Sequence, residues 1–158
     1  MAVGLATDPV AFRRAAVDDL RTIVALLADD PIGRGRENPG TQLDTCYRDA
    51  FAAIERDPHQ LLAIAERSGE VIGVLQLSFI PGLTRRGMWR GQIEGVRVAA
   101  EERGSGVGRA MLEWAVGECR KRGCGLVQLT SDKRRSGTQS FYEALGFRPT
   151  HEGYKLSL

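Results

Sequence analysis

A strand that leads through a charged turn into a glycine-rich helix start is the feature that most constrains this chain. The segment reads Val96-Arg97-Val98-Ala99-Ala100-Glu101-Glu102-Arg103-Gly104-Ser105-Gly106-Val107-Gly108-Arg109. Glycine inside a helix costs about 1 kcal/mol relative to alanine, so three glycines here need a compensating role. The first N–H groups of a helix have no partner within it and lie at its partial-positive end. The segment therefore predicts an anion site, and a pyrophosphate is the natural occupant.

Three phosphate-binding patterns compete for this turn. A Walker A loop needs a second glycine five residues after the first, and Arg109 stands at that place relative to Gly104. A dinucleotide fingerprint, Gly-x-Gly-x-x-Gly, also fails at Arg109. The pattern Arg-x-x-Gly-x-Gly does fit, at Arg103, Gly106 and Gly108. A turn that only packs tightly is the alternative interpretation, because short glycine motifs occur often by chance.

Size and charge exclude several classes of protein. The chain has 158 residues, the length of one domain, and we expect a single domain over residues 1–158 with a core from about residue 10. A net charge of +2 does not suggest a nucleic-acid binder. The longest apolar runs, 61–65 and 71–75, are far shorter than the ~20 residues of a membrane-spanning helix. We therefore expect neither nucleic acid nor membrane as a partner.

The cysteines and histidines predict reduced thiols and no metal. The three cysteines are Cys46, Cys119 and Cys124. An odd number without Cys-x-x-Cys spacing is typical of a cytoplasmic protein, and residues 1–12 contain no Lys or Arg before an apolar block, so no secretory signal is expected. Neither His59 nor His151 has metal-ligand spacing with cysteines or carboxylates. We expect a cytoplasmic location and no metal site.

Apolar periodicity and turn residues predict alternating strands and helices. Strands are expected over residues 10–14, 61–66, 70–79, 92–99, 125–130 and 154–158. Helices are expected over residues 18–27, 43–54, 104–121 and 136–145. Residues 29–40, dense in glycine and proline, are predicted to form a binding loop. The order β-α-α-β-β-β-α-β-α-β predicts an α/β (α+β) fold, a central mixed sheet flanked by about four helices.

The turn and a second motif resemble the GCN5-related N-acetyltransferase (GNAT) superfamily. In that family Arg/Gln-x-x-Gly-x-Gly/Ala holds the pyrophosphate of acetyl-CoA, which matches residues 103–108 here. The second motif, Phe141-Tyr142-Glu143-Ala144-Leu145-Gly146-Phe147, resembles the end of the family's final helix. The resemblance covers about residues 10–158 and implies a GNAT-type acyl-CoA N-acyltransferase fold. The chain is similar to small bacterial members of unassigned substrate and, in its last third, to aminoalkylphosphonate acetyltransferases.

The resemblance implies where acetyl-CoA binds. Backbone amides of the glycine turn would hold the pyrophosphate, and the strand before it would pair with the pantetheine arm. Many members carry Asn where this chain has Arg135, so an Asn contact to the pantetheine is not expected. A separate candidate, the cluster Lys133-Arg134-Arg135, is expected to contact the 3′-phosphate of CoA. The expected cofactor contacts are Val96, Arg97, Val98, Arg103, Gly104, Ser105, Gly106, Val107, Gly108, Arg109, Arg135 and Tyr142.

The resemblance also implies catalytic roles. The Val98 N–H is the candidate to polarise the thioester carbonyl. Tyr142 is the candidate general acid, because a phenol with a pKa near ~10 is protonated at neutral pH; Phe141 is expected to be the core residue of the pair. Glu94, next to Ile93 in an Ile-Glu pair that resembles the glucosamine-phosphate acetyltransferases, is the candidate base, and partnership with an arginine is its alternative. The reserve bases are His151, Glu152 and Asp132.

We therefore expect an acetyl-CoA-dependent N-acetyltransferase that acts on a primary amine of a small molecule by direct attack in a ternary complex. A protein or peptide N-acetyltransferase and a non-catalytic acyl-CoA sensor are the open alternatives. The acceptor is expected to enter between the 29–40 loop and residues 81–89, where Asp29, Asp30 and Glu37 suit a cationic amine and Arg34 and Arg36 an anionic group. The resemblance further implies that the chain can form a homodimer.

Overall fold

One sheet of five strands, in the order β1-β2-β3-β4-β5, organises the computed structural model, which describes residues 8–158. The strands are β1 (Ala11–Arg14), β2 (Gln60–Arg67), β3 (Glu70–Ile80), β4 (Arg90–Val98) and β5 (Leu126–Leu129). The first four pair antiparallel, and β5 runs parallel to β4, so the predicted mixed sheet is confirmed. Residues 1–7, which the expected domain includes, lie outside the described part.

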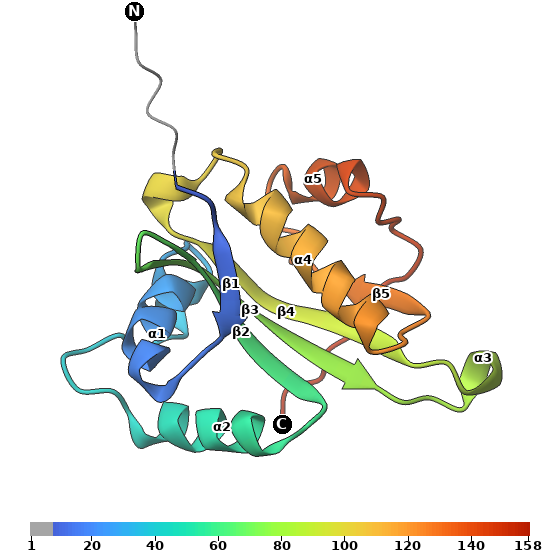
Figure 1. Ribbon diagram of the computed structural model, residues 1–158, viewed down its shortest axis with the longest axis horizontal. Helices are drawn as coiled ribbons and strands as arrows, with labels where there is room; N and C mark the ends of the chain where they lie inside the picture. Colours follow the sequence, from blue (N-terminus) through green and yellow to red (C-terminus); the bar gives the residue numbers. More distant parts are fainter. Residues whose placement is uncertain (1–7) are drawn as a thin grey trace, which may run out of the picture.

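Residues 8–158 form five helices, of which α3 lies beyond the ends of β3 and β4 (Figure 1). They are α1 (Leu20–Ala28), α2 (Thr45–Arg56), α3 (Thr84–Gly87), α4 (Val107–Lys121) and α5 (Thr138–Ala144). Short 3-10 turns lie at Val17–Asp19, Gly33–Gly35 and Ala100–Glu102. Four of these helices match the predicted ones, whereas the single turn α3 was not predicted. Within residues 8–158, no helix combines the length and the apolar character needed to cross a bilayer.

Alternating side chains of the sheet build two cores, one on each face. On the face covered by α4, Leu77 and Ile93 pack with Met111 and Ala115 of that helix. On the other face, Ile64 and Val74 pack with buried residues of α1 and α2. These second-face partners include Ile23, Val24 and Phe51. The sheet is therefore the middle layer of the molecule, and its central strands are apolar on both sides.

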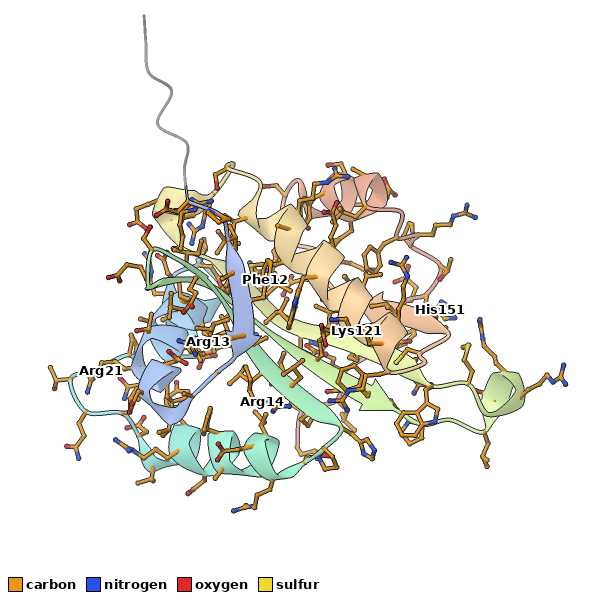
Figure 2. The ribbon with its side chains drawn as sticks, in the orientation of Figure 1. Phe12, Arg13, Arg14, Arg21, Lys121 and His151 are labelled. Atoms are coloured by element: carbon orange, nitrogen blue, oxygen red, sulfur yellow. The ribbon has the colours of Figure 1, made fainter. Side chains whose placement is uncertain are left out.

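The short strand β1 shows the same alternation on a small scale (Figure 2). The Phe12 ring stacks on Trp114 of α4, with ring centroids 5.2 Å apart. The next side chain, Arg13, donates from Nη1 to Asp19 Oδ2 at 2.7 Å and from Nε to Glu66 Oε2 at 3.0 Å. β1 thus ties the start of α1 to the edge of the sheet.

The glycine turn lies outside the helix that was predicted to contain it. Gly104 and Gly106 have φ values of +80° and +90°, in the left-handed region that a right-handed helix excludes. The helix α4 therefore begins at Val107, and Gly106 is its cap residue. Propensity arguments place a helix near these glycines but do not fix which residue begins it.

The predicted last strand, residues 154–158, is wrong. Its apolar residues Tyr154, Leu156 and Leu158 are 92%, 87% and 116% exposed, and the segment pairs with no strand among the described residues. Their spacing of two residues is typical of a half-buried strand, but a strand also needs a neighbour to receive its hydrogen bonds. The sheet ends at β5, so the pattern alone was not sufficient.

Gly91 provides a test of how closely α4 approaches the sheet. A Cβ placed at Gly91 would overlap Cys119 Sγ of α4, and Cys119 is fully buried. Because overpacking a core typically costs 1–3 kcal/mol, we expect Gly91→Ala to lower the free energy of unfolding by about 2 kcal/mol in urea titrations. Adding Cys119→Ala should recover part of that loss. An unchanged unfolding midpoint in Gly91→Ala would contradict this close approach.

Candidate functional site

The strands β4 and β5 part halfway along β4. Pairing joins Arg90–Ile93 of β4 to Leu126–Leu129 of β5 and goes no further. At the same point β4 bulges: between its pairs Glu94–Gln76 and Arg97–Val74, β4 has one residue more than β3. Gly95 takes a φ of +61° in this bulge. Residues 94–98 therefore keep β3 as a neighbour on one edge and have an open edge on the other.

The open edge offers a backbone N–H at Val98. The Ala99 N–H donates to Ile72 O at 2.8 Å, toward β3. Because successive residues of a strand direct their backbone groups to opposite edges, the N–H and C=O of Val98 lie on the open side. Arg103 Nε donates to the Val98 carbonyl at 3.1 Å and Arg97 Nη1 to the Val96 carbonyl at 2.8 Å. The arginines therefore occupy the carbonyl acceptors and leave the Val98 N–H as a donor.

The first turn of α4 presents unpaired N–H groups. Its first helical bond runs from the Ala110 N–H to Gly106 O at 3.0 Å. Among the described residues, no backbone acceptor receives the N–H of Val107, Gly108 or Arg109. Ser105 Oγ donates back to Glu102 O at 2.6 Å, which holds the turn before the helix. Free N–H groups at the positive end of a helix suit an anion such as a pyrophosphate.

A buried carboxylate, Asp30, connects the loop after α1 to this region. Asp30 is 8% exposed and accepts the N–H groups of Ile32 and Gly33 at 2.8 and 2.9 Å. Arg97 Nε of β4 lies 2.7 Å from Asp30 Oδ2, and Arg135 Nη2 lies 3.1 Å from Oδ1. Burial favours the neutral acid, but the two N–H bonds and the two arginines outweigh it and lower the pKa of Asp30 to about 2.

Neighbouring acidic residues of the loop are also engaged. Arg103 Nη2 donates to the carbonyl and carboxylate oxygens of Asp29, both at 2.8 Å. Tyr47 donates its hydroxyl to Glu37 Oε2 at 2.9 Å. Of the three acidic residues that suit a cationic amine, Asp29 and Asp30 are thus paired with arginines, and Glu37 accepts a tyrosine hydroxyl. Sequence reasoning did not find the role of Asp30, since its partners are distant in the chain.

Tyr142 lies half-buried in α5. Its ring meets those of Phe141 and Phe147 at centroid distances of 5.2 and 6.1 Å. Burial raises the pKa of Tyr142, and the nearby cations Arg135 and Arg97 oppose that rise only in part, so the phenol is protonated at neutral pH. Phe141 is 37% exposed, and the expectation that it is the buried member of the pair is wrong. The reason is that the face of α5 that packs on the core carries Tyr142 and Leu145.

The candidate bases have different partners. Glu94 is exposed and accepts Gln92 Nε2 at 3.0 Å, with no cation paired to it among residues 8–158. Arg134 bonds to Asp132 and holds the pKa of that carboxyl well below its usual range. Lys133 donates to Glu152 at 2.9 Å, which lowers the pKa of Glu152. His151 Nδ1 lies 2.7 Å from Thr150 Oγ1.

Most of the basic side chains predicted to bind phosphate already form ion pairs with carboxylates of this protein. Lys133, Arg134 and Arg135 contact Glu152, Asp132 and Asp30. Arg109 Nε pairs with Glu113 at 2.9 Å. The structure therefore gathers Val98, the glycine turn, Arg97, Arg135 and Tyr142 around the open end of β4, whereas Lys133 and Arg134 point to exposed ion pairs of their own.

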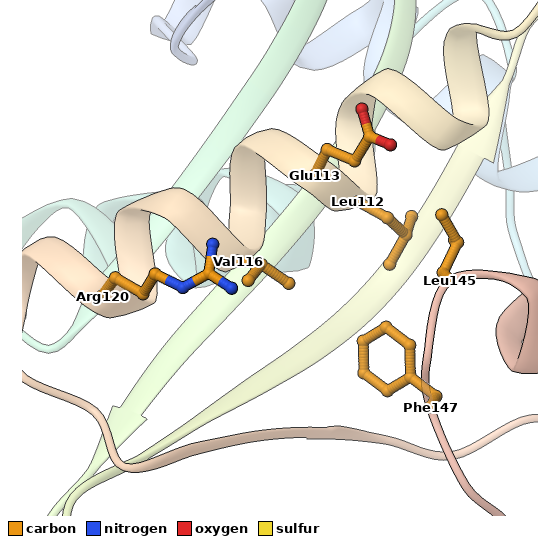
Figure 3. A pocket seen from close by; sticks show the side chains of 6 residues that line it. All are labelled: Leu112, Glu113, Val116, Arg120, Leu145 and Phe147. Atoms are coloured by element: carbon orange, nitrogen blue, oxygen red, sulfur yellow. The ribbon is translucent and has the colours of Figure 1, made fainter.

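A shallow pocket of about 170 Å³ lies between α4 and the residues that follow α5 (Figure 3). Leu145 and Phe147 face Leu112 and Val116 of α4 across it, with Glu113 and Arg120 at its rim. These apolar contacts seat the segment after α5, and with it Tyr142, against α4.

Comparison with known proteins gives consistent results. The sequence model described as "Acetyltransferase (GNAT) family" matches residues 15–147. An aminoalkylphosphonate N-acetyltransferase of Salmonella typhimurium is 31% identical over 92% of this chain and 90% of its own length. A glucosamine 6-phosphate N-acetyltransferase of Trypanosoma brucei brucei is 35% identical over 58% of this chain and 60% of its own. A crystal structure titled a transcriptional regulator, from Bacillus halodurans C-125, is 43% identical, covers 95% of this chain and 100% of its own, and has a TM-score of 0.93.

The lowered pKa of Asp30 predicts how the free energy of unfolding depends on pH. Its folded pKa of about 2 lies below the usual ~3.9 of an unfolded Asp, so its stabilisation is present above pH ~4 and is lost as the pH falls toward 2. We expect Asp30→Asn to lower the free energy of unfolding at pH 7 by about 2–4 kcal/mol, because two arginines lose their partner. Urea titrations at pH 7 and pH 3 should show a smaller difference from the wild type at pH 3.

The matched control is Asp29→Asn, whose half-exposed pair with Arg103 should contribute less than about 1 kcal/mol. Equal losses in Asp29→Asn and Asp30→Asn would contradict the central place of the buried carboxylate.

Proposed function

Because the chain belongs to the GNAT acetyltransferase family, we propose that it moves an acetyl group from acetyl-CoA to a primary amine of a small molecule. That it is an N-acetyltransferase follows from the family and from its named N-acetyltransferase relatives. The donor, the acceptor class and the direct attack are the proposed part. One observation carries it: free N–H groups of the α4 turn and the open edge of β4 lie at the same end of the sheet as Tyr142.

The chain's own residues fit acetyl-CoA. The N–H groups of Val107, Gly108 and Arg109 would hold the pyrophosphate, and the open edge of β4 would receive the amide-rich pantetheine arm. Gly108 leaves unfilled a space that a Cβ could enter, because that Cβ would make only ordinary contacts, 3.6 Å from Phe141 Cζ and 3.7 Å from Val98 Cγ2. When bound, acetyl-CoA would supply an activated acetyl thioester.

The residues around the open edge would then act in sequence. Glu94, directly or through water, takes a proton from the ammonium form of the acceptor. The Val98 N–H donates to the thioester carbonyl oxygen as negative charge grows on it. The free amine would bond to the thioester carbonyl carbon and release its second proton to solvent, the C–S bond would break, and Tyr142 would give its proton to the departing thiolate. A covalent route through cysteine is disfavoured, because burial raises the pKa of Cys119 to about 12 and also raises that of Cys124.

Two other functions are distinguished by experiment. Both named curated relatives act on small amines, which supports a small-molecule acceptor over a protein. The similar crystal structure described as a transcriptional regulator is the reason to test a non-catalytic role as well. Thiol release from acetyl-CoA over a panel of small amines and peptides separates the three. Turnover with small amines supports the proposal, turnover with peptides alone replaces the acceptor class, and tight CoA binding without turnover supports a sensor.

Three further expectations stay predictions. We propose one N-acetyltransferase domain with a core from about residue 10 to 158, supported by a family match that spans residues 15–147. A homodimer and a cytoplasmic location stay predictions from the sequence.

Gly108→Ala tests the pyrophosphate site apart from folding. The added Cβ meets only ordinary contacts and improves helix propensity by up to about 1 kcal/mol, so the free energy of unfolding should not fall. We expect the Kd for acetyl-CoA in calorimetry to rise at least tenfold, because the methyl group enters the space beside the free N–H groups. Gly117→Ala, in the same helix with open space around it, is the control and should bind acetyl-CoA normally. Identical affinities in the two variants would reject this binding site.

Tyr142→Phe tests the general acid. Without its hydroxyl the thiolate must leave unprotonated, and we expect kcat to fall about 100-fold while the KM for acetyl-CoA changes less than threefold. Steady-state thiol-release kinetics measure both constants. Tyr154→Phe, at an exposed position, serves as the control. A normal kcat in Tyr142→Phe would remove this residue from the mechanism.

A further inference from the structure

A row of polar side chains crosses four strands on the sheet face opposite α4. Gln60, Ser78, Gln92 and Gln128 are partners in register on β2, β3, β4 and β5, and we call them the polar row. Ser78 Oγ donates to Gln60 Oε1 at 2.8 Å, and Gln128 Nε2 donates to Gln92 Oε1 at 2.6 Å. Strands lie ~4.8 Å apart, so the row is about 14 Å long.

The polar row connects to the candidate base. Gln92 Nε2 donates to Glu94 Oε1 at 3.0 Å. Gln76, the partner of Glu94 across β3 and β4, donates to Gln60 Oε1 at 2.8 Å. All of these side chains are half-buried or exposed, whereas the apolar residues of this face, Ile64 and Val74, are covered by α1 and α2. A molecule lying on the polar row would therefore reach Glu94 without displacing a core.

Unpaired positive charge lies beyond the other end of β4. Arg90 is two residues before Gln92, so alternation places both on the same face of the strand. Arg90 Nε is buried and has no hydrogen-bond partner within residues 8–158. Its Nη1 is 3.8 Å from the Cβ position of Gly82, so the guanidinium lies against the loop between β3 and β4.

That loop carries two more arginines with unusual backbone. Arg85 and Arg86 in α3 have φ values of +52° and +61°, a left-handed conformation that is uncommon for non-glycine residues and is enriched at ligand sites. In the part of the chain that the structure describes, none of Arg85, Arg86 and Arg90 has an ion-pair partner. Arg97, Arg103 and Arg135, by contrast, each contact Asp29 or Asp30. Arg90 thus gives the face a cation at the end nearest this loop, Arg85 and Arg86 lie in the loop beyond it, and Glu94 gives the face a carboxylate.

We propose that this face binds the acceptor, and that the acceptor is a primary amine that also carries a phosphate or phosphonate group. This rests on the proposed function, because it names the acceptor class of the same site. The amine lies toward Glu94, the anionic group at Arg90 with Arg85 and Arg86, and neutral polar groups along Gln92 and Ser78. Arginine matches the oxygens of a phosphate with paired N–H donors, and glutamine amides suit hydroxyl groups. Arg90 and Glu94 are four residue steps apart on β4, which places their backbones roughly 13 Å apart.

The experiment compares glucosamine 6-phosphate with glucosamine in thiol-release assays at saturating acetyl-CoA. For the wild type we expect kcat/KM to be at least 50-fold higher for the phosphorylated amine. Arg90→Gln should lower that ratio at least tenfold, Arg90→Lys should restore part of it, and Arg86→Gln should lower it about threefold. Arg56→Gln, at an exposed position of α2, is the control and should keep the wild-type ratio.

The outcomes separate this inference from the proposed function. An unchanged ratio in both Arg90→Gln and Arg86→Gln overturns the inference even when the protein acetylates amines. If the wild type acetylates neither amine, calorimetry with glucosamine 6-phosphate and the CoA-saturated protein decides: a Kd that rises tenfold in Arg90→Gln and not in Arg56→Gln supports the anion site alone. If glucosamine 6-phosphate does not bind in this way, the inference about the acceptor face is overturned. If Arg90→Gln does not fold, Arg86→Gln gives the same decision.

Discussion

The buried carboxylate of Asp30 is the interaction on which the arrangement of the site depends. Its position after α1 would be an ordinary loop without Arg97 from β4 and Arg135 from the segment before α5, which meet on its two oxygens. Burying one carboxylate is unfavourable unless it is paired and hydrogen-bonded, and here both conditions are met. Three distant segments are held together by one negative charge, and the two cations that it holds lie close enough to Tyr142 to oppose the rise in the pKa of its phenol.

Around this cluster the backbone provides the binding groups. The bulge at Gly95 and the short pairing of β5 open one edge of β4, and the left-handed glycines before α4 leave that helix start bare. Arg103 and Arg97 occupy the carbonyls of Val98 and Val96, so the open edge is left with donors rather than acceptors. Donors are what a thioester carbonyl and a pyrophosphate require. Arg97 and Arg103 thus shape the site by holding backbone and loop.

Some of this could be read from residue patterns and some could not. The strands predicted at 61–66 and 70–79, the four predicted helices and the mixed sheet follow from periodicity and turn chemistry, which are local properties. The glycine turn, Val98, Tyr142 and Glu94 were predicted from motifs and from the family resemblance, and their roles stay predictions. The role of Asp30 was missed because its partners are 67 and 105 positions away in sequence (97 − 30 and 135 − 30), and the mixed charge of its loop indicated no pairing. The exposed end at 154–158 was missed because alternation gives a strand's faces but not its neighbour.

By itself, the sequence determined most of the element types and the glycine-rich start of α4, and it suggested the residues proposed here for acetyl transfer, because each depends on side chains or glycines close together in the chain. Only the tertiary structure decided which charged side chains are paired with one another. Asp29 and Asp30 are neutralised by arginines brought from β4 and beyond, whereas Arg90 is left without a carboxylate beside a polar face assembled from four strands. Ion pairing acts over a few ångströms in space, and the fold, not the spacing along the chain, sets those distances.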